Sequence, residues 1–185
     1  VNAMLAIYLM LGPAGAVYSL DHWRAQRRVA VTRRSPRLYD DVAPSMSANL
    51  VLRLIQVHMC IVYLFGGISK LKGEMWWDGS AVWFALANHE YQSFDLTTIS
   101  HWPWLIALLT HVTVFWETFY PVLIWPRLTR PIMLTLAVAV HGGIALFLGM
   151  PTFGLAMLIG NAAFLSPDFV RSIVERGRAA ATSGA

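Results

Sequence analysis

Charged side chains and cysteines are both scarce in this sequence. Only 13% of its 185 residues are charged and 57% are apolar, whereas about a quarter of a soluble domain is charged. So few polar groups cannot cover the surface of a soluble fold of this length. The single cysteine, Cys60, lies in an apolar stretch, so it makes neither an internal disulfide nor a C-x-x-C redox pair. The composition therefore excludes a soluble fold and a thiol redox mechanism.

Several familiar signals are also missing. The sequence has no H-E-x-x-H motif and no paired Cys/His spacing, so no metal site is expected. The first apolar stretch lacks the basic start and the small-residue cleavage site of a signal peptide. The chain begins at Val1, at the edge of an apolar segment, so we expect the natural start of the protein to be missing.

Long apolar runs are the dominant feature of what is present. They cover residues 3–20, 50–68, 102–125, 132–148 and 152–165. A helix that crosses a bilayer needs about 20 residues, with a range of about 17–25. The middle three runs satisfy this length, and the last is short. The runs predict an all-α polytopic membrane bundle of about five transmembrane helices in residues 1–168, followed by a cytoplasmic tail in residues 169–185.

The basic residues indicate how such a bundle is oriented. If all five runs cross, twelve of the fourteen Lys and Arg residues fall on one side of the membrane, and Lys70 and Lys72 fall on the other. Lys and Arg gather on the cytoplasmic side of membrane proteins. We therefore expect residues 21–48 inside and residues 70–101 outside, in a multi-pass protein of the cell membrane. The net charge of +4 then serves topology and contact with anionic lipid rather than nucleic acid.

The stretch between the second and third runs is rich in tryptophan, which concentrates at the lipid–water interface. Residues 77, 81, 84, 85 and 88 follow helical spacing. This predicts a short interfacial helix over residues 79–88, with Asp78 as its cap.

Polar groups inside the apolar runs are candidate functional residues, because an ionisable group in lipid is costly. The ionisable ones are His58, His111, Glu117 and His141, and Thr113 shares a helical face with Glu117. The alternative is that they only hold helices together, with Glu117 protonated or paired with a buried histidine. Gly142 follows His141, and a small residue there permits close approach of a helix or a ligand.

Lys70 lies at the outer end of the second run, after Gly66 and Gly67 and before Trp76 and Trp77. A lysine at this depth commonly anchors a helix by keeping its amine in water. In a low-dielectric pocket the neutral amine is favoured instead, and it can act as a base. The glycines would let a ligand approach, and the aromatic run would form the mouth of a cavity. Both interpretations of Lys70 stay open at this point.

The segment Gly-Ile-Ser-Lys-Leu at 67–71, followed by Trp-Trp-Asp-Gly at 76–79, resembles the vitamin K-dependent gamma-glutamyl carboxylases. Residues 53–167 resemble more closely their bacterial relatives, the horizontally transferred transmembrane (HTTM) domain proteins. Further matching stretches lie at 18–23, at 83–88 and from 141 onward. The resemblance covers most of the chain and implies a bacterial inner-membrane protein.

In the carboxylases, the second of two adjacent lysines is taken to be the base that deprotonates vitamin K hydroquinone. Oxygen then converts the quinol to an epoxide, and carboxylation of glutamate follows. The resemblance implies that Lys70 is this base and that His141 helps to hold the quinol, although Ser69 replaces the first lysine. The eukaryotic enzymes also carry a large lumenal domain for their protein substrates. The given chain ends about twenty residues after its last apolar run, so we do not expect it to carboxylate a protein.

The resulting expectation is quinol-linked chemistry in a lipid-accessible cavity, by a carboxylase-like lyase or oxidoreductase. Lys70 and His141 are the expected catalytic residues, and Gly66, Gly67, Trp76, Trp77 and Gly142 the expected quinol-binding ones. The alternatives are a non-catalytic membrane subunit and a small transporter of the same fold. An enzyme needs Lys70, Glu117 or His141 to converge on one cavity.

Overall fold

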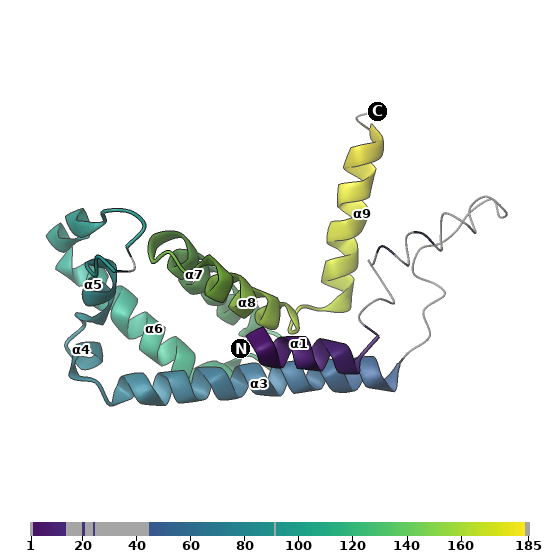
Figure 1. Cartoon of the computed structure of the whole chain (residues 1–185), viewed down its shortest axis with the longest axis horizontal. Helices are drawn as coiled ribbons and strands as arrows, with labels where there is room; N and C mark the ends of the chain where they lie inside the picture. The colour runs from purple at the N-terminus through teal and green to yellow at the C-terminus, as the bar shows by residue number, and fades with distance from the viewer. Residues whose placement is uncertain (1, 14–19, 21–23, 25–44, 91, 184–185) are drawn as a thin grey trace. The chain divides into compact units, whose positions relative to one another are not determined.

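The computed structural model describes residues 2–13, 20, 24, 45–90 and 92–183, and every regular element within these ranges is helical. The chain divides into two compact units, residues 1–57 and residues 58–185. The helices are α1 (Asn2–Leu11), α3 (Met46–Leu71), α4 (Glu74–Trp77), α5 (Ala81–Leu86), the 3₁₀ helix η1 (Thr97–His101), α6 (Pro103–Leu123), α7 (Arg130–Phe147), α8 (Pro151–Ala162) and α9 (Pro167–Ser183) (Figure 1). The predicted all-α class is confirmed.

Three of the described helices, α3, α6 and α7, are long and apolar enough to cross a membrane. They correspond to the middle three predicted runs. Helix α8 has only 12 residues, and with the start of α9 it forms a pair bent by 114° that counts as a fourth candidate span. Of the first predicted run, α1 is a 10-residue helix, and residues 14–19 lie outside the described residues. The structure thus supports three or four spans, and the count of five stays a prediction.

In the first unit, Gly12 lies close to α3. A Cβ atom built on this glycine would come 3.0 Å from Cγ2 of Val51. Two residues further along α3, the Arg53 guanidinium donates to Oε1 of Gln56 over 3.0 Å. The spacing of three residues places both side chains on the same side of the helix, which allows this bond.

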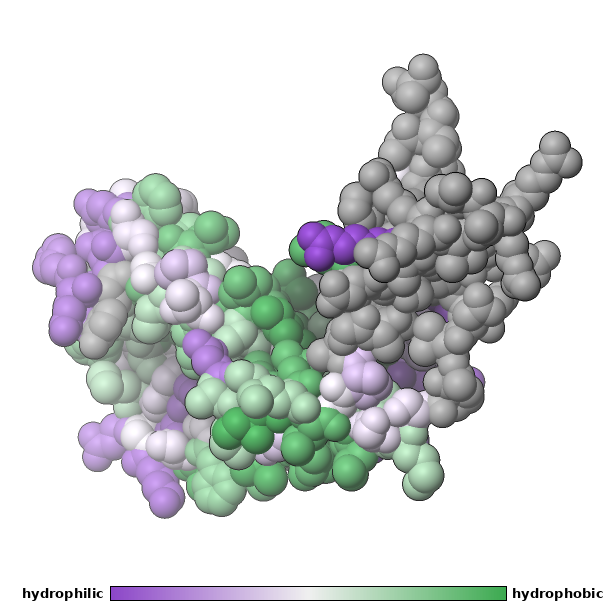
Figure 2. Space-filling view, turned by 45° about the vertical axis from the view of Figure 1, so that its right-hand side comes forward, coloured by the Kyte–Doolittle hydropathy of each residue, from purple (hydrophilic) through white to green (hydrophobic). Residues whose placement is uncertain are grey.

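The second unit exposes many large apolar side chains. Phe65, Leu108, Val122, Val138 and Leu146 are each at least half exposed. Figure 2 shows a broad apolar area on the described surface. A soluble protein rarely exposes so much apolar surface without a partner, whereas lipid tails cover it at no cost. The helices of this unit therefore suit a lipid bilayer.

Small residues let the helices of the second unit approach closely. A Cβ atom on Gly67 of α3 would come 2.5 Å from Oγ1 and 2.7 Å from the backbone nitrogen of Thr118 in α6. A Cβ atom on Gly154 of α8 would come 2.5 Å from the carbonyl oxygen of His141 in α7. These crossings follow the small-residue rule of membrane helices, and they bring the polar residues of α3, α6, α7 and α8 within reach of one another.

The short helix predicted over residues 79–88 is present as α5, with narrower bounds, and a second short helix, α4, precedes it and was not predicted. Gly79 separates them with a φ of +82°, a conformation that glycine adopts without strain. The Thr110 hydroxyl of α6 donates to the Gly79 carbonyl over 2.9 Å and accepts from the backbone N–H of Val82 over 3.2 Å. Tertiary contacts with α6 thus set the boundary between the two short helices.

The predicted capping role of Asp78 is wrong in detail. Its carboxylate accepts from the backbone N–H and the hydroxyl of Ser80, over 2.8 and 2.6 Å, and Ser80 itself precedes α5. The two hydrogen bonds from Ser80 hold the pKa of the Asp78 carboxyl below its ordinary value. Asp78 therefore forms a local turn before the helix rather than a cap on its first amides.

Candidate functional site

An ion pair joins α3 to α6 within the second unit. The Lys70 amine lies 2.5 Å from Oε2 of Glu117, and the side chains are 26% and 10% exposed. The Glu117 side chain is buried among the helices rather than facing lipid. Of the two expected alternatives for Glu117, the histidine partner is wrong, because the partner is Lys70, whereas the protonated carboxyl stays a prediction. Two costly groups meet here, so each reduces the cost of burying the other.

The surroundings of the pair explain why it fits. A Cβ atom on Gly66 would lie 3.1 Å from Oε2 of Glu117 and 3.8 Å from the Lys70 amine, so glycine leaves the space that the pair occupies. The Lys70 amine also lies 5.3 Å from the centroid of the Trp76 ring, within range of a cation–π contact. One carboxylate and one aromatic face thus hold the amine from two sides.

A second, uncharged cluster links α3, α6, α7 and α8. The Tyr63 hydroxyl lies 2.8 Å from Nε2 of His141, and the Asn161 amide donates to the Tyr63 oxygen over 2.7 Å. The Tyr120 hydroxyl donates to Oδ1 of Asn161 over 2.6 Å. All four residues are at most 3% exposed. We call Tyr63, Tyr120, His141 and Asn161 the neutral network.

Aromatic rings enclose His141. Its ring centroid lies 5.8 Å from that of Tyr63, 5.9 Å from that of Trp116 and 5.8 Å from that of Phe153. The Trp116 indole donates to the carbonyl oxygen of Met133 rather than to the histidine. Among the described residues, His141 Nδ1 is buried and has no hydrogen-bond partner.

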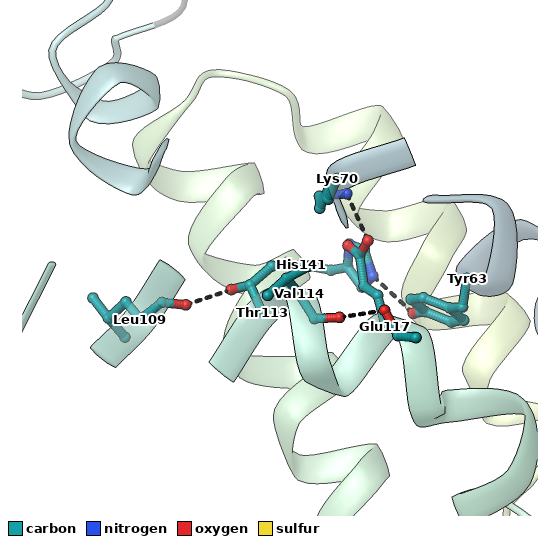
Figure 3. A network of polar contacts seen from close by, with 8 residues as sticks. Tyr63, Lys70, Leu109, Thr113, Val114, Glu117 and His141 are labelled. Atoms are coloured by element: carbon teal, nitrogen blue, oxygen red, sulfur yellow. Dashed lines mark hydrogen bonds and ion pairs between the residues drawn. The ribbon is translucent and has the colours of Figure 1, made fainter. Parts of the chain in front are cut away.

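The ion pair and the neutral network belong to one polar region. Figure 3 shows Lys70, Glu117, Tyr63 and His141 gathered where α3, α6 and α7 meet. Lys70, Glu117 and His141 therefore lie in one polar region, and the expected cavity at this place stays a prediction.

The other expected quinol-binding residues divide into three kinds. Gly67 lies where α3 crosses α6, and a side chain there would overlap Thr118, so its small size is required for helix packing. Trp77 is 58% exposed and its indole donates to the Leu71 carbonyl over 2.7 Å, away from the amine of Lys70. At Gly142 an added Cβ atom would meet nothing within 4 Å, so open space lies beside the residue that follows His141.

Two of the polar candidates lie outside the region. The Thr113 hydroxyl donates to the Leu109 carbonyl of its own helix over 2.8 Å, a bond that satisfies it without a second helix (Figure 3). His58 is partly exposed on α3. It lies five residues before Tyr63, which turns it about 140° away around the helix.

Sequence reasoning assigned no role to Tyr63, Tyr120 or Asn161. A usable signal was present. Tyr63 precedes Lys70 by seven residues and Tyr120 follows Glu117 by three, which are spacings of a shared helix face. A tyrosine in the middle of an apolar run also needs a partner for its hydroxyl.

Two further features of the region concern unfilled contacts. His141 Nδ1 is a buried polar atom without a partner among the described residues, and the space beside Gly142 is open. Within the described ranges, no group of three or more His, Cys, Asp or Glu residues could hold a metal ion.

Comparison with known proteins gives one match. The model of the HTTM domain family matches residues 2–169, which is most of the chain. No curated protein and no solved structure matches. The family match agrees with the sequence resemblance, and the apolar helices and the intramembrane polar region agree with a multi-pass membrane protein. The chain belongs to the HTTM domain family, whose membrane proteins are related to the vitamin K-dependent carboxylases.

Proposed function

We propose that this protein acts on a quinol inside the bilayer, with the Lys70 amine as the base that takes a proton from a ring hydroxyl. The observation that carries this proposal is the Lys70–Glu117 pair, 2.5 Å apart and only partly exposed, in the same region as His141. An ionisable group within a membrane helix marks a functional site by default. Here two such groups share one proton.

The pair has two arrangements of that proton. In one, an ammonium faces a carboxylate; in the other, the proton lies on Glu117 and the amine of Lys70 is neutral. Removal of water favours the second arrangement, because neither group then bears a charge. The neutral amine can accept the proton of a ring O–H: that bond breaks, an N–H bond forms, and the ring oxygen keeps the electron pair. Glu117 then acts as the store for the proton that Lys70 gives up beforehand.

A bound quinol would supply the electrons that molecular oxygen accepts. The residues of this chain would bind and orient it: Trp76 beside the amine, and His141 with the open space at Gly142 on the side of α7. Acyl or glutamyl acceptors are not part of the proposal. A bacterial inner membrane, where quinols are dissolved in the lipid, is the proposed location.

A non-catalytic role is the second candidate, because a Lys–Glu pair also links two helices without any chemistry. The two functions differ in what Lys70 must do. A structural pair requires only a cation at this position, whereas a base requires a group that can release and take up a proton.

The test uses the protein in lipid nanodiscs and follows oxygen-dependent oxidation of reduced 2-methyl-1,4-naphthoquinone. Lys70→Ala should lower the rate by about 10²–10⁴-fold, the usual contribution of a positioned base. Lys72→Ala is the matched control, because Lys72 is exposed and lies two residues away. Equal rates in wild type and both variants would exclude Lys70 as the base, and no turnover in wild type would favour the non-catalytic function.

A further inference from the structure

The hydrogen bonds of the neutral network determine where the proton of His141 lies. The Asn161 amide has two N–H groups and one oxygen. One N–H faces the Met157 carbonyl over 2.8 Å, and a carbonyl can only accept, so the orientation of the amide is fixed. The second N–H donates to the Tyr63 oxygen, and the amide oxygen accepts from Tyr120. Every polar atom of Asn161 is thereby used.

The Tyr63 hydroxyl must then donate to His141. Its oxygen already accepts from Asn161, and the group within reach of its own proton is Nε2 of His141, 2.8 Å away. An Nε2 atom that accepts carries no proton. A neutral imidazole has one proton, so it lies on Nδ1. This assignment follows from hydrogen-bond accounting along the network, which is how histidine tautomers are assigned when hydrogens are not observed.

Nδ1 is the atom of His141 that is buried without a partner among the described residues. His141 is 2% exposed, so bulk water does not satisfy this N–H. A buried donor without an acceptor is unfavourable, and a ligand oxygen that accepts from it removes the penalty. Three polar side chains from three other helices thus present one unused donor in the same region as the Lys70–Glu117 pair.

We propose that Tyr120, Asn161 and Tyr63 fix His141 as a hydrogen-bond donor at Nδ1, and that this N–H binds a ring oxygen of the substrate. His141 would then stabilise negative charge on that oxygen and take no proton from it. Tyr63, Asn161 and Tyr120 are positioning residues, because they act through His141. The claim that His141 binds a ring oxygen, which we call the ligand half, rests on the proposed quinol chemistry. The claim that the proton lies on Nδ1 does not.

The proton is located by ¹⁵N NMR of histidine-labelled protein in nanodiscs at neutral pH, with His141→Asn used to assign the His141 signals. We expect Nδ1 in the range of a protonated nitrogen and Nε2 in the range of a bare one. Tyr63→Phe should shift the population toward the Nε2–H form, because Nε2 loses its donor. A proton on Nε2 in wild type would overturn the assignment, and an unchanged spectrum in Tyr63→Phe would overturn the role of the network.

The ligand half is tested by the affinity for oxidised 2-methyl-1,4-naphthoquinone, measured as quenching of tryptophan fluorescence. Asparagine places an amide N–H near the position of Nδ1, whereas glutamine places its amide near Nε2. His141→Gln should therefore weaken binding by about tenfold or more, the effect of losing one buried hydrogen bond. His141→Asn should lose less. His101→Asn, on an exposed histidine, is the matched control.

The two measurements separate the two proposals. Equal affinity in wild type and His141→Gln would overturn the ligand role of Nδ1 even if the protein oxidises quinol. An absence of naphthoquinone binding by wild type would contradict the ligand half and the proposed function together. A protonated Nδ1 in the NMR spectrum would still establish the donor in that case, since that experiment requires no turnover.

Discussion

The second unit contains two polar clusters, the Lys70–Glu117 pair and the neutral network, and they differ in charge and in exposure. The Lys70–Glu117 pair carries opposite charges and is partly exposed, at 26% and 10%. The neutral network carries no charge, is at most 3% exposed, and uses each hydroxyl and amide in a hydrogen bond. The charged groups thus lie in the less buried part of the region, and the fully buried part is held by hydrogen bonds between neutral groups. The comparison separates an accessible ion pair from a buried neutral frame.

Removal of one charge should have the largest effect on stability. Lys70→Leu leaves Glu117 without its partner, and breaking a buried pair costs about 3 kcal/mol or more. The double variant Lys70→Leu/Glu117→Leu should recover most of the loss, because no charge is left behind. The measurement is the unfolding transition of each variant in mixed micelles. A double variant as unstable as the single one would show that packing, not charge, dominates this contact.

The crossing that brings the pair together should be next in effect. Gly67→Ala forces α3 and α6 apart, because the added Cβ would overlap the backbone of Thr118. Overpacking of this kind costs about 1–3 kcal/mol. Gly142→Ala is the matched control for stability, since its Cβ meets nothing within 4 Å. Equal unfolding transitions in the two variants would contradict the close crossing.

The smallest effect is expected within the neutral network. Tyr120→Phe keeps the ring and removes the donor to Oδ1 of Asn161, at a cost of about 1–2 kcal/mol. The same unfolding experiment checks it. If Tyr120→Phe lowered the free energy of unfolding as much as Lys70→Leu does, the charged pair and the neutral network would not differ in their contribution to stability.

The long helices could be predicted from the sequence because an apolar run of sufficient length has few alternatives to a membrane span. The short helices α4 and α5 could not be delimited in the same way. Their boundary depends on Gly79 and on the Thr110 hydroxyl of α6, 31 residues further along the chain. Local pattern alone does not contain that contact.

The residues of the site could be predicted only in part. Lys70, Glu117 and His141 stand out because ionisable groups are rare in apolar runs. The partner of Glu117 was not predictable, since Lys70 precedes it by 47 residues and the contact depends on how α3 crosses α6. Tyr63 and Tyr120 were missed because an aromatic ring inside a run contributes to the apolar pattern and conceals its hydroxyl.

The most direct test of the central claim is the turnover of Lys70→Arg in the naphthoquinone assay. Arginine keeps the positive charge and can pair with Glu117, but it does not release its proton at any pH that proteins tolerate. The variant should therefore retain most of the wild-type stability and lose turnover by about 10²-fold or more. A folded Lys70→Arg protein that oxidises the reduced naphthoquinone at the wild-type rate would contradict the assignment of Lys70 as the base.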